Sequence, residues 1–273
     1  MIFVDNNMDT IEPSCPFDNT AYTGTPDTKQ TFKALDIPKL IGELDVLYAD
    51  NDYPAAERLI SAGMEKAVSA GDWRSQLSLV SEQLGLYRKT MEEDKALSAI
   101  NEAEKLIAAH SMGRTVSGAT VLLNAATTMK CFGNAEGSIP LFEHVLIVYS
   151  ENLDPHDYRF AGLYNNMALS YEDTGNYGKA EKLFRMAVEL LGSLENTNND
   201  LTVTWCNLAE MYDSLDNEDG RISECMENAG ELLLDPGLEH DGYFAFTAGK
   251  CLPLFDRLGF FYYAAQLRKI LED

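Results

Sequence analysis

Basic residues are scarce in this chain of 273 residues, and their scarcity excludes whole classes of partner. Lys and Arg number 21 against 44 Asp and Glu, which gives a formal net charge of −23. A surface this acidic repels the phosphates of nucleic acids and of anionic membranes, so we expect no nucleic acid and no membrane as partner. The plain alternative is that the excess charge only keeps the protein in solution.

Membrane, export and disulfide signals are also lacking. No stretch approaches the roughly 20 consecutive apolar residues that a membrane-spanning helix needs. The N-terminus carries Asp5 and Asp9 before any basic residue, which is unlike a secretory signal. The cysteines are odd in number and none are spaced as C-x-x-C, which predicts neither a disulfide framework nor a thiolate zinc site. Together these features predict a cytoplasmic protein.

Signals of catalysis are equally hard to find. The histidines do not have the spacing of metal ligands on one helix, and the common nucleotide-binding, hydrolase and metalloprotease motifs are absent. The acidic segment 213–220 lacks the spacing to a closing glutamate that an EF-hand calcium loop has, so we interpret it as an acidic turn. We expect no cofactor, no metal and no catalytic residue. An enzyme is a remote alternative, because function has to be argued from a site.

What the chain does contain is a long repeat. From about residue 36 onward the hydrophobic pattern is helical, and segment 176–184 repeats the Tyr, Ala, acid, base and apolar residues of segment 52–60 at the same offsets. A small residue followed four positions later by an apolar one recurs at steps of 40, 42 and 42. The series is Ala56/Ile60, Ala96/Ile100, Ser138/Phe142 and Ala180/Phe184, with a weaker last member at Ala265.

This repeat divides the chain into helix pairs, whose first and second members we call the A helix and the B helix. The predicted pairs are 37–70, 72–110, 113–151, 157–193, 199–234 and 241–272. Neither helix of a pair can bury its apolar stripe alone, so neighbouring pairs must stack. The bulky residues that recur at the repeat step are predicted to be buried between helices, namely Phe142, Tyr171, Phe184, Trp205 and Tyr212.

The predicted fold class is therefore all-α, a right-handed α-solenoid of about six antiparallel helix pairs. Residues 1–30 differ from the rest, since Pro13, Pro16 and Pro26 alternate there with Asn, Asp and Thr. We expect an extended or partly disordered N-terminal arm in residues 1–30 and the helical repeat domain in residues 31–273.

The spacings match the tetratricopeptide signature, W-x2-L-G-x2-Y followed by A-x3-F. Tyr164-x2-Met167-Ala168-x2-Tyr171 with Ala180-x3-Phe184 fits both halves, and Trp205-x2-Leu208-Ala209-x2-Tyr212 fits the first half with Ala for Gly. The step of 40–42 exceeds the ordinary 34 and resembles the long repeats of kinesin light chains, as does the linker Asp154-Pro155-His156-Asp157. The resemblance covers roughly residues 37–272. It implies a concave surface, lined by the A helices, that holds a partner protein or peptide.

Asparagines recur at one position of three successive A helices and form the first set of candidate binding residues. Asn124, Asn166 and Asn207 are 42 and 41 residues apart, and Asn165 lies beside the second of them. A side-chain amide both donates and accepts, so such a ladder can pair with the main chain of a bound peptide. The alternative is that these amides bond helix to helix, and the two roles do not exclude one another.

Charged residues at the ends of the A helices form the second candidate set. The family resemblance implies that the last turn of each A helix faces partly toward the concave side. Its charge changes sign along the chain, through Arg88 and Lys89, Lys130, Glu172 and Asp173, and Asp213. Either these charges are chance placements on a solvated face, or the groove orients a partner by its charge.

The sequence thus predicts a non-catalytic scaffold or adaptor that binds a protein or peptide. The alternative is a sensor or regulatory domain that binds a peptide signal and responds by changing the curvature of the solenoid.

Overall fold

The computed structural model of this protein describes residues 35–215 and 220–272, and the regular structure in them is entirely helical. Twelve α-helices and one short 3-10 helix follow one another, and no strand occurs within these two ranges. The prediction of an all-α helical repeat fold is confirmed. The predicted N-terminal arm, residues 1–30, lies outside the described ranges, and the domain boundary at residue 31 stays a prediction.

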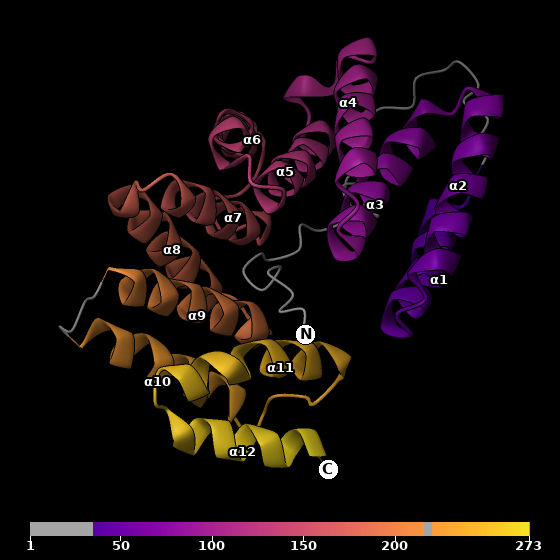
Figure 1. Ribbon diagram of the computed structural model, residues 1–273. Coiled ribbons are helices and arrows are strands. Elements are labelled where there is room, and N and C mark those ends of the chain that lie inside the picture. The colour runs from indigo at the N-terminus through magenta and orange to yellow at the C-terminus, as the bar shows by residue number, and fades with distance from the viewer. Residues whose placement is uncertain (1–34, 216–219, 273) are drawn as a thin grey trace. The chain divides into compact units, whose positions relative to one another are not determined.

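Successive helices form pairs whose bounds agree with the predicted ones (Figure 1). The pairs are α1 (Ile37–Ala49) with α2 (Tyr53–Ala70), α3 (Trp73–Thr90) with α4 (Glu93–Ala109), α5 (Val116–Cys131) with α6 (Ala135–Asn152), α7 (Arg159–Asp173) with α8 (Tyr177–Gly192), α9 (Asn198–Ser214) with α10 (Arg221–Leu233), and α11 (Gly242–Arg257) with α12 (Phe261–Glu272). The 3-10 helix η1 (Met112–Arg114) precedes α5.

The described residues fall into two compact units of three pairs each. The N-terminal unit comprises α1–α6 in residues 35–154, and the C-terminal unit comprises α7–α12 in residues 155–272. Within each unit the A helices of neighbouring pairs touch, α3 with α5 in the first, and α7 with α9 and α9 with α11 in the second.

In two pairs a Gly-Asn dipeptide connects the A helix to the B helix. Gly133 and Gly175 follow α5 and α7 with φ of 82° and 76°, a left-handed conformation that glycine adopts without strain. The asparagine after each glycine caps the next helix, since the side chain of Asn134 accepts from the Gly137 amide at 3.0 Å and that of Asn176 from the Lys179 amide at 3.4 Å. One dipeptide thus ends one helix and begins the next.

The hydrophobic core lies between the helices at the positions that repeat. All five predicted aromatic residues are buried, and so are the small residues that let the helices approach, Ala126, Ala168 and Ala209 in the A helices and Ala56, Ala96, Ser138 and Ala180 in the B helices. Burying aromatic side chains of this size supplies much of the stability of a domain.

The last member of the repeat series needs a correction of one residue. Ala265, the predicted small core residue of α12, is exposed, whereas the neighbouring Ala264 is fully buried. Ala264 follows Ala180 by 84 residues, which is two steps of 42. The register therefore continues through the last pair, and the two adjacent alanines concealed it in the sequence.

Candidate functional site

The asparagine positions of the A helices lie in buried seams between helices. Nδ2 of Asn124 on α5 donates to Oγ of Ser81 on α3 at 2.7 Å, and Nδ2 of Asn207 on α9 donates to Oδ1 of Asn165 on α7 at 2.9 Å. Nδ2 of Asn165 in turn donates to Oδ1 of Asn166 at 3.3 Å. These asparagines are all buried. Asn124 and Asn207 thus bond the preceding A helix, and the role of the asparagines in binding a peptide stays a prediction.

Arg88, the first predicted basic groove residue, is also part of a seam. Its side chain is only 2% exposed. Nη1 donates to the side chain of Thr128 at 2.9 Å and to the main-chain oxygen of Asn124 at 3.4 Å, so this guanidinium ties the end of α3 to α5. Its charge is covered by the neighbouring A helix and is not displayed as the sequence suggested. Lys89 and Lys130 are half-buried and leave part of their side chains at the surface.

The acidic positions of the C-terminal unit lie nearer the surface. Asp173 at the end of α7 is exposed, and Glu172 and Asp213 are half-buried. Arg257 at the end of α11 reaches back to α9, where its guanidinium pairs with Asp213 and with Glu210. Since Arg257 neutralises part of the charge on α9, the most exposed anionic position among the predicted site residues is at the end of α7.

A charged network also joins the B helices. On α8, Oε1 of Glu181 accepts from the Tyr212 hydroxyl at 2.7 Å, and the Arg221 guanidinium lies 3.6 Å from Glu181 and 4.3 Å over the Tyr212 ring. The hydroxyl bond holds the pKa of Glu181 below its usual value, and burial raises the pKa of Tyr212 to about 12. An acid on one B helix, a tyrosine on the next A helix and a cation on the next B helix thus form one contact.

A buried carboxyl that is not among the predicted site residues lies at the start of α9. Oδ1 of Asp200 accepts from the Tyr243 hydroxyl at 2.5 Å, and the Tyr158 hydroxyl also bonds to this carboxyl. Burial raises the pKa of Asp200, while the two hydroxyl bonds oppose the rise. Tyr158, Asp200 and Tyr243 are 42 and 43 residues apart, so aligning the repeats would have placed them together.

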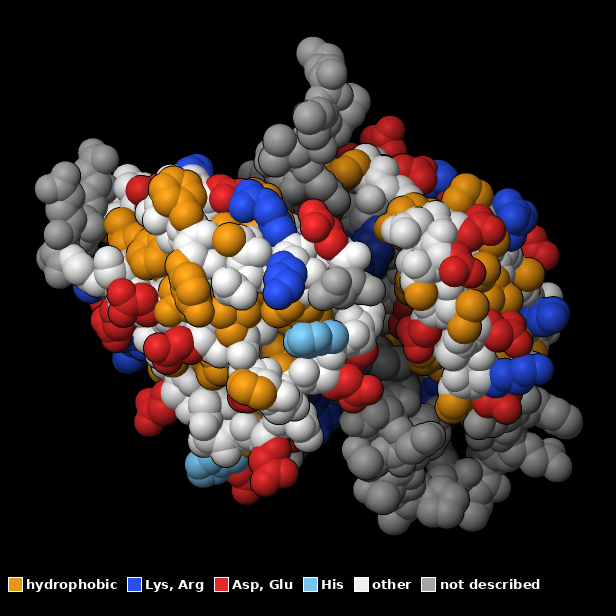
Figure 2. Space-filling view, turned by 90° about the horizontal axis from the view of Figure 1, so that it is seen from below, with side chains coloured by type: hydrophobic (Ala, Val, Ile, Leu, Met, Phe, Trp, Pro, Cys, Tyr) orange, Lys and Arg blue, Asp and Glu red, His pale blue; other side chains and the backbone are white. Residues whose placement is uncertain are grey.

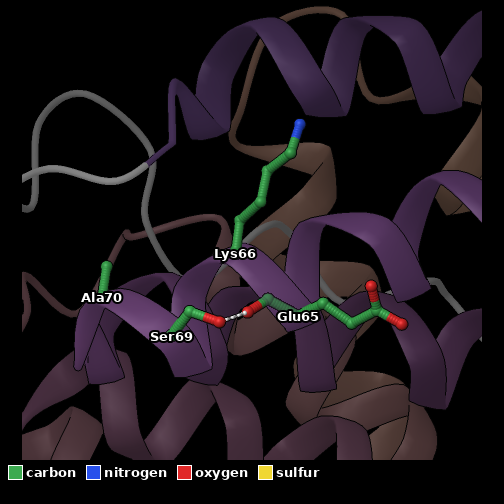
Figure 3. Close-up of a pocket in the computed structure, with 4 residues that line it drawn as sticks. All are labelled: Glu65, Lys66, Ser69 and Ala70. Atoms are coloured by element: carbon green, nitrogen blue, oxygen red, sulfur yellow. Dashed lines mark hydrogen bonds between the residues drawn. The ribbon is translucent and has the colours of Figure 1, made fainter.

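The described surface has a shallow hollow on α2, but the residues that line it come from a single helix (Figure 3). Glu65, Lys66, Ser69 and Ala70 line it, all from one helix, and the Ser69 hydroxyl already donates to the main-chain oxygen of Glu65 at 2.8 Å. Four residues of one helix cannot converge on a ligand from several directions, as the polar groups of small-molecule sites do.

Metal clusters and membrane-spanning helices do not occur in residues 35–215 and 220–272. Three or more His, Cys, Asp or Glu side chains nowhere gather there in a way that could hold a metal ion. None of the helices described is both long enough and apolar enough to cross a membrane.

Comparisons with known proteins agree with the fold. Residues 160–194, which cover α7 and α8, match a family model described as tetratricopeptide repeat. No curated protein matches the sequence. Among solved structures, BtubC (BKLC) from P. vanneervenii is 20% identical with a TM-score of 0.64, over 75% of this chain and 82% of that one.

A second solved structure is similar over much of its length. It is a putative kinesin light chain from Podosopora anserina with nearly identical TPR-like repeats, 15% identical with a TM-score of 0.52, over 71% of this chain and 92% of that one. A crystal structure of a variant of that protein gives a TM-score of 0.53. At such identities the likeness shows the fold alone. Residues 160–194 therefore form a tetratricopeptide repeat, and the chain has the TPR-like helical repeat fold with long, kinesin-light-chain-like repeats, which is typical of protein-interaction scaffolds.

Proposed function

We propose that this chain is a non-catalytic scaffold or adaptor that binds a protein or peptide along its A helices, at the last turn of each. The observation that carries the proposal is the contrast in burial along α7. From Phe160 to Tyr171 every residue except Tyr164 is buried, whereas Glu172 and Asp173 at its end come to the surface. Apart from the half-buried Arg159 and Tyr164, α7 can therefore offer a partner only its last turn.

The charges on these turns suggest which charges a partner should carry. In the C-terminal unit they carry Glu172, Asp173 and Asp213, which would attract a basic segment. In the N-terminal unit Lys89 and Lys130 would attract an acidic one. Arg88 contributes through Lys89, because its bonds to α5 fix the turn on which Lys89 sits. Partly exposed charges of this kind mainly set specificity and association rate, and salt weakens them.

The asparagine seams support the same proposal in a structural role. The buried amides of Asn124 and Asn207 bond the preceding A helix, while Asn165 and Asn166 bond each other within α7. The first two bonds keep the last turns of neighbouring A helices at a fixed spacing. A repeat protein that presents charges at regular intervals needs such a frame, because binding loses less entropy when the contacting groups are held in place beforehand.

A displayed library of random peptides tests the proposal. Peptides selected on the full chain should be rich in Lys and Arg. Their association should be several-fold slower in about 500 mM than in about 50 mM NaCl, because the salt screens the attraction. Asp173→Lys should slow association at low salt, whereas Glu189→Lys, an exposed reversal on the B helix α8, should not. Failure to select any peptide, or equal effects of the two reversals, would contradict the proposal.

A further inference from the structure

Buried thiols gather in the C-terminal unit. Cys206 on α9 and Cys251 on α11 are each 5% exposed, and Cys225 on α10 is 1% exposed. All three are free cysteines. Figure 2 shows hydrophobic and charged side chains at the surface of the C-terminal helices, in the left half of the view, and the thiols lie beneath such a surface. The binding proposed at the last turns of the A helices makes no use of these thiols.

Two of these thiols meet in the seam between α9 and α11. Cys206 and Cys251 share a hydrogen bond, which together with burial raises the pKa of Cys206. The two sulfurs are therefore in contact, and they come from two A helices that touch. Cys225 influences the Cys206 thiol through its charge and not through a hydrogen bond. The cluster thus contains one close pair of thiols and a third thiol on the neighbouring B helix.

The thiol pair lies where two other seams have an amide bond. Asn207 of α9 bonds α7, and the position 43 residues later on α11 is Lys250, which carries no amide. Cys206 directly precedes Asn207 and Cys251 directly follows Lys250, so the thiol contact lies beside that position. A thiol is only a weak donor and a weak acceptor. At this level the last seam therefore has a weaker bond than the seam between α7 and α9.

We propose that Cys206 and Cys251 form a reversible disulfide when the chain meets a peroxide, and that this bond locks the last helix pair to the pair before it. Two sulfurs that already share a hydrogen bond need only a small movement to reach the S–S bond length of about 2.05 Å. In a cytoplasmic protein, which the sequence predicts, a disulfide is usually transient and responds to the redox state of the cell.

The oxidation has two steps. Sγ of Cys251 attacks hydrogen peroxide, an S–O bond forms as the O–O bond breaks, and the thiol proton leaves with the displaced oxygen as water. Sγ of Cys206 then attacks the sulfenic sulfur, an S–S bond forms as the S–O bond breaks, and a second water leaves. Two thiols are oxidised and one peroxide is reduced to two waters. Cys251 reacts first because the raised pKa of Cys206 keeps that thiol protonated.

Burial controls the rate of this reaction, and small thiols reverse it. Neither sulfur can meet a peroxide while the seam between α9 and α11 is closed, so oxidation follows the local opening of the last pair. The disulfide then forms as the seam closes again. A small thiol such as glutathione reduces the bond by exchange and is itself oxidised to its own disulfide.

Peptide mapping of the full chain after treatment with hydrogen peroxide, without denaturant, tests the proposal. Trypsin places the three thiols in separate peptides, 186–221, 222–250 and 251–257. We expect a linked product of the first and the last of these peptides, lighter by two hydrogen atoms than their sum, which disappears on reduction. The oxidised chain should also melt about 5 °C or more above the reduced chain, because the disulfide restricts the unfolded state.

Substitutions of single cysteines supply the second measurement. Cys206→Ala and Cys251→Ala should each abolish the linked product and the rise in melting temperature, whereas the matched control Cys225→Ala should keep both. Circular dichroism shows whether each variant is folded, and the peptide map of the wild type decides even if one is not.

Two results would overturn the proposal. In the first, Cys206 and Cys251 stay reduced in the wild type while the same peroxide oxidises glutathione added to the sample. In the second, the linked product contains peptide 222–250, so that Cys225 supplies one of the sulfurs. None of these measurements uses a peptide ligand, so their outcome is independent of the binding proposed at the A helices.

Discussion

The N-terminal and C-terminal units join neighbouring A helices through the same seam bond. In the first, the Asn124 amide of α5 donates to Ser81 of α3, and in the second, the Asn207 amide of α9 donates to Asn165 of α7. The bonded residues are 43 and 42 residues apart, which is one more than the repeat step of 42 and the step itself. The donor is an asparagine in both units, while the acceptor changes from a hydroxyl to an amide.

The units also share the contact between B helices. In the N-terminal unit Glu57 on α2 pairs with Lys95 on α4 at 2.6 Å, and the Lys95 ammonium lies 5.6 Å from the Tyr87 ring centroid. Glu181 with Arg221 and the Tyr212 ring repeats this arrangement in the C-terminal unit. Both contacts between pairs are therefore properties of the repeat and not of one unit.

The last turn of the A helices is where the units differ. In the N-terminal unit Arg88 turns inward and bonds α5, whereas at the corresponding position of the C-terminal unit Glu172 lies half-buried beside the exposed Asp173. The asparagine bond and the contact between B helices occur in both units, whereas the Arg88 bond to α5 belongs to the N-terminal unit, where the C-terminal unit has an acidic surface instead. The comparison teaches that the shared bonds carry structure in both units, while the last turn carries structure in the first unit and can carry specificity in the second.

The largest effect should come from the core aromatic that both units place at the same repeat position. Phe142→Ala and Phe184→Ala each remove a fully buried phenyl ring and leave a cavity, so each should lower the free energy of unfolding by about 3–5 kcal/mol. Urea denaturation followed by circular dichroism measures both losses. A loss below about 1 kcal/mol for either residue would show that the two positions are not equivalent parts of the core.

A smaller effect is expected where the units differ. Arg88→Met removes a buried guanidinium and its bonds to Thr128 and to the Asn124 carbonyl, which should cost about 1.5–3 kcal/mol. Lys89→Met changes the half-buried neighbour and should stay within about 0.5 kcal/mol. The denaturation midpoints of the two variants show whether Arg88→Met loses more stability than Lys89→Met. Equal losses would mean that Arg88 does not act through its seam bonds.

The seam bond itself should contribute about 1 kcal/mol in each unit. A double-mutant cycle of Asn207→Ala with Asn165→Ala measures the coupling in the C-terminal unit, and one of Asn124→Ala with Ser81→Ala measures it in the N-terminal unit. We expect the two coupling energies to agree within about 0.5 kcal/mol. A coupling near zero in one unit alone would break the equivalence of the two seams.

The helix pairs could be predicted closely because their signals are local and repeated. The step of 40–42 residues predicted the register of the first four pairs, and the Gly-Asn dipeptides after α5 and α7 mark the ends of helices through their conformational preferences. The last pair was displaced by one residue for an equally local reason. Ala264 and Ala265 are both small, and the aromatic that would have chosen between them is replaced by Arg268.

The environment of the candidate residues was harder to predict. Periodicity places Arg88 on the last turn of its helix, but its burial depends on Thr128, which lies 40 residues later on another helix. The asparagine ladder likewise allowed two interpretations, because an amide can bond a peptide or a neighbouring helix. The Asp200 cluster, in contrast, was within reach of the sequence, since its three members share the repeat step. It was overlooked because they differ in residue type.

The smallest effect concerns Asp200, whose buried carboxyl has no counterpart among the predicted site residues. Burial raises its folded-state pKa above the ordinary value of 3.8, so the folded state binds the proton more tightly than the unfolded state does. The stability that this group contributes is therefore fully present below pH 3.8 and is lost as the pH rises through the raised folded-state pKa. Asp200→Asn cannot titrate, so its free energy of unfolding relative to the wild type should rise across that window. In a chain that keeps Asp200, Tyr243→Phe removes a hydroxyl that favours the carboxylate and should raise the pKa of Asp200 further. The loss of stability should then extend to higher pH. Denaturation series from about pH 4 to 8 measure both differences. A stability difference between Asp200→Asn and the wild type that does not change with pH would show that this carboxyl has the same pKa in the folded and unfolded chain.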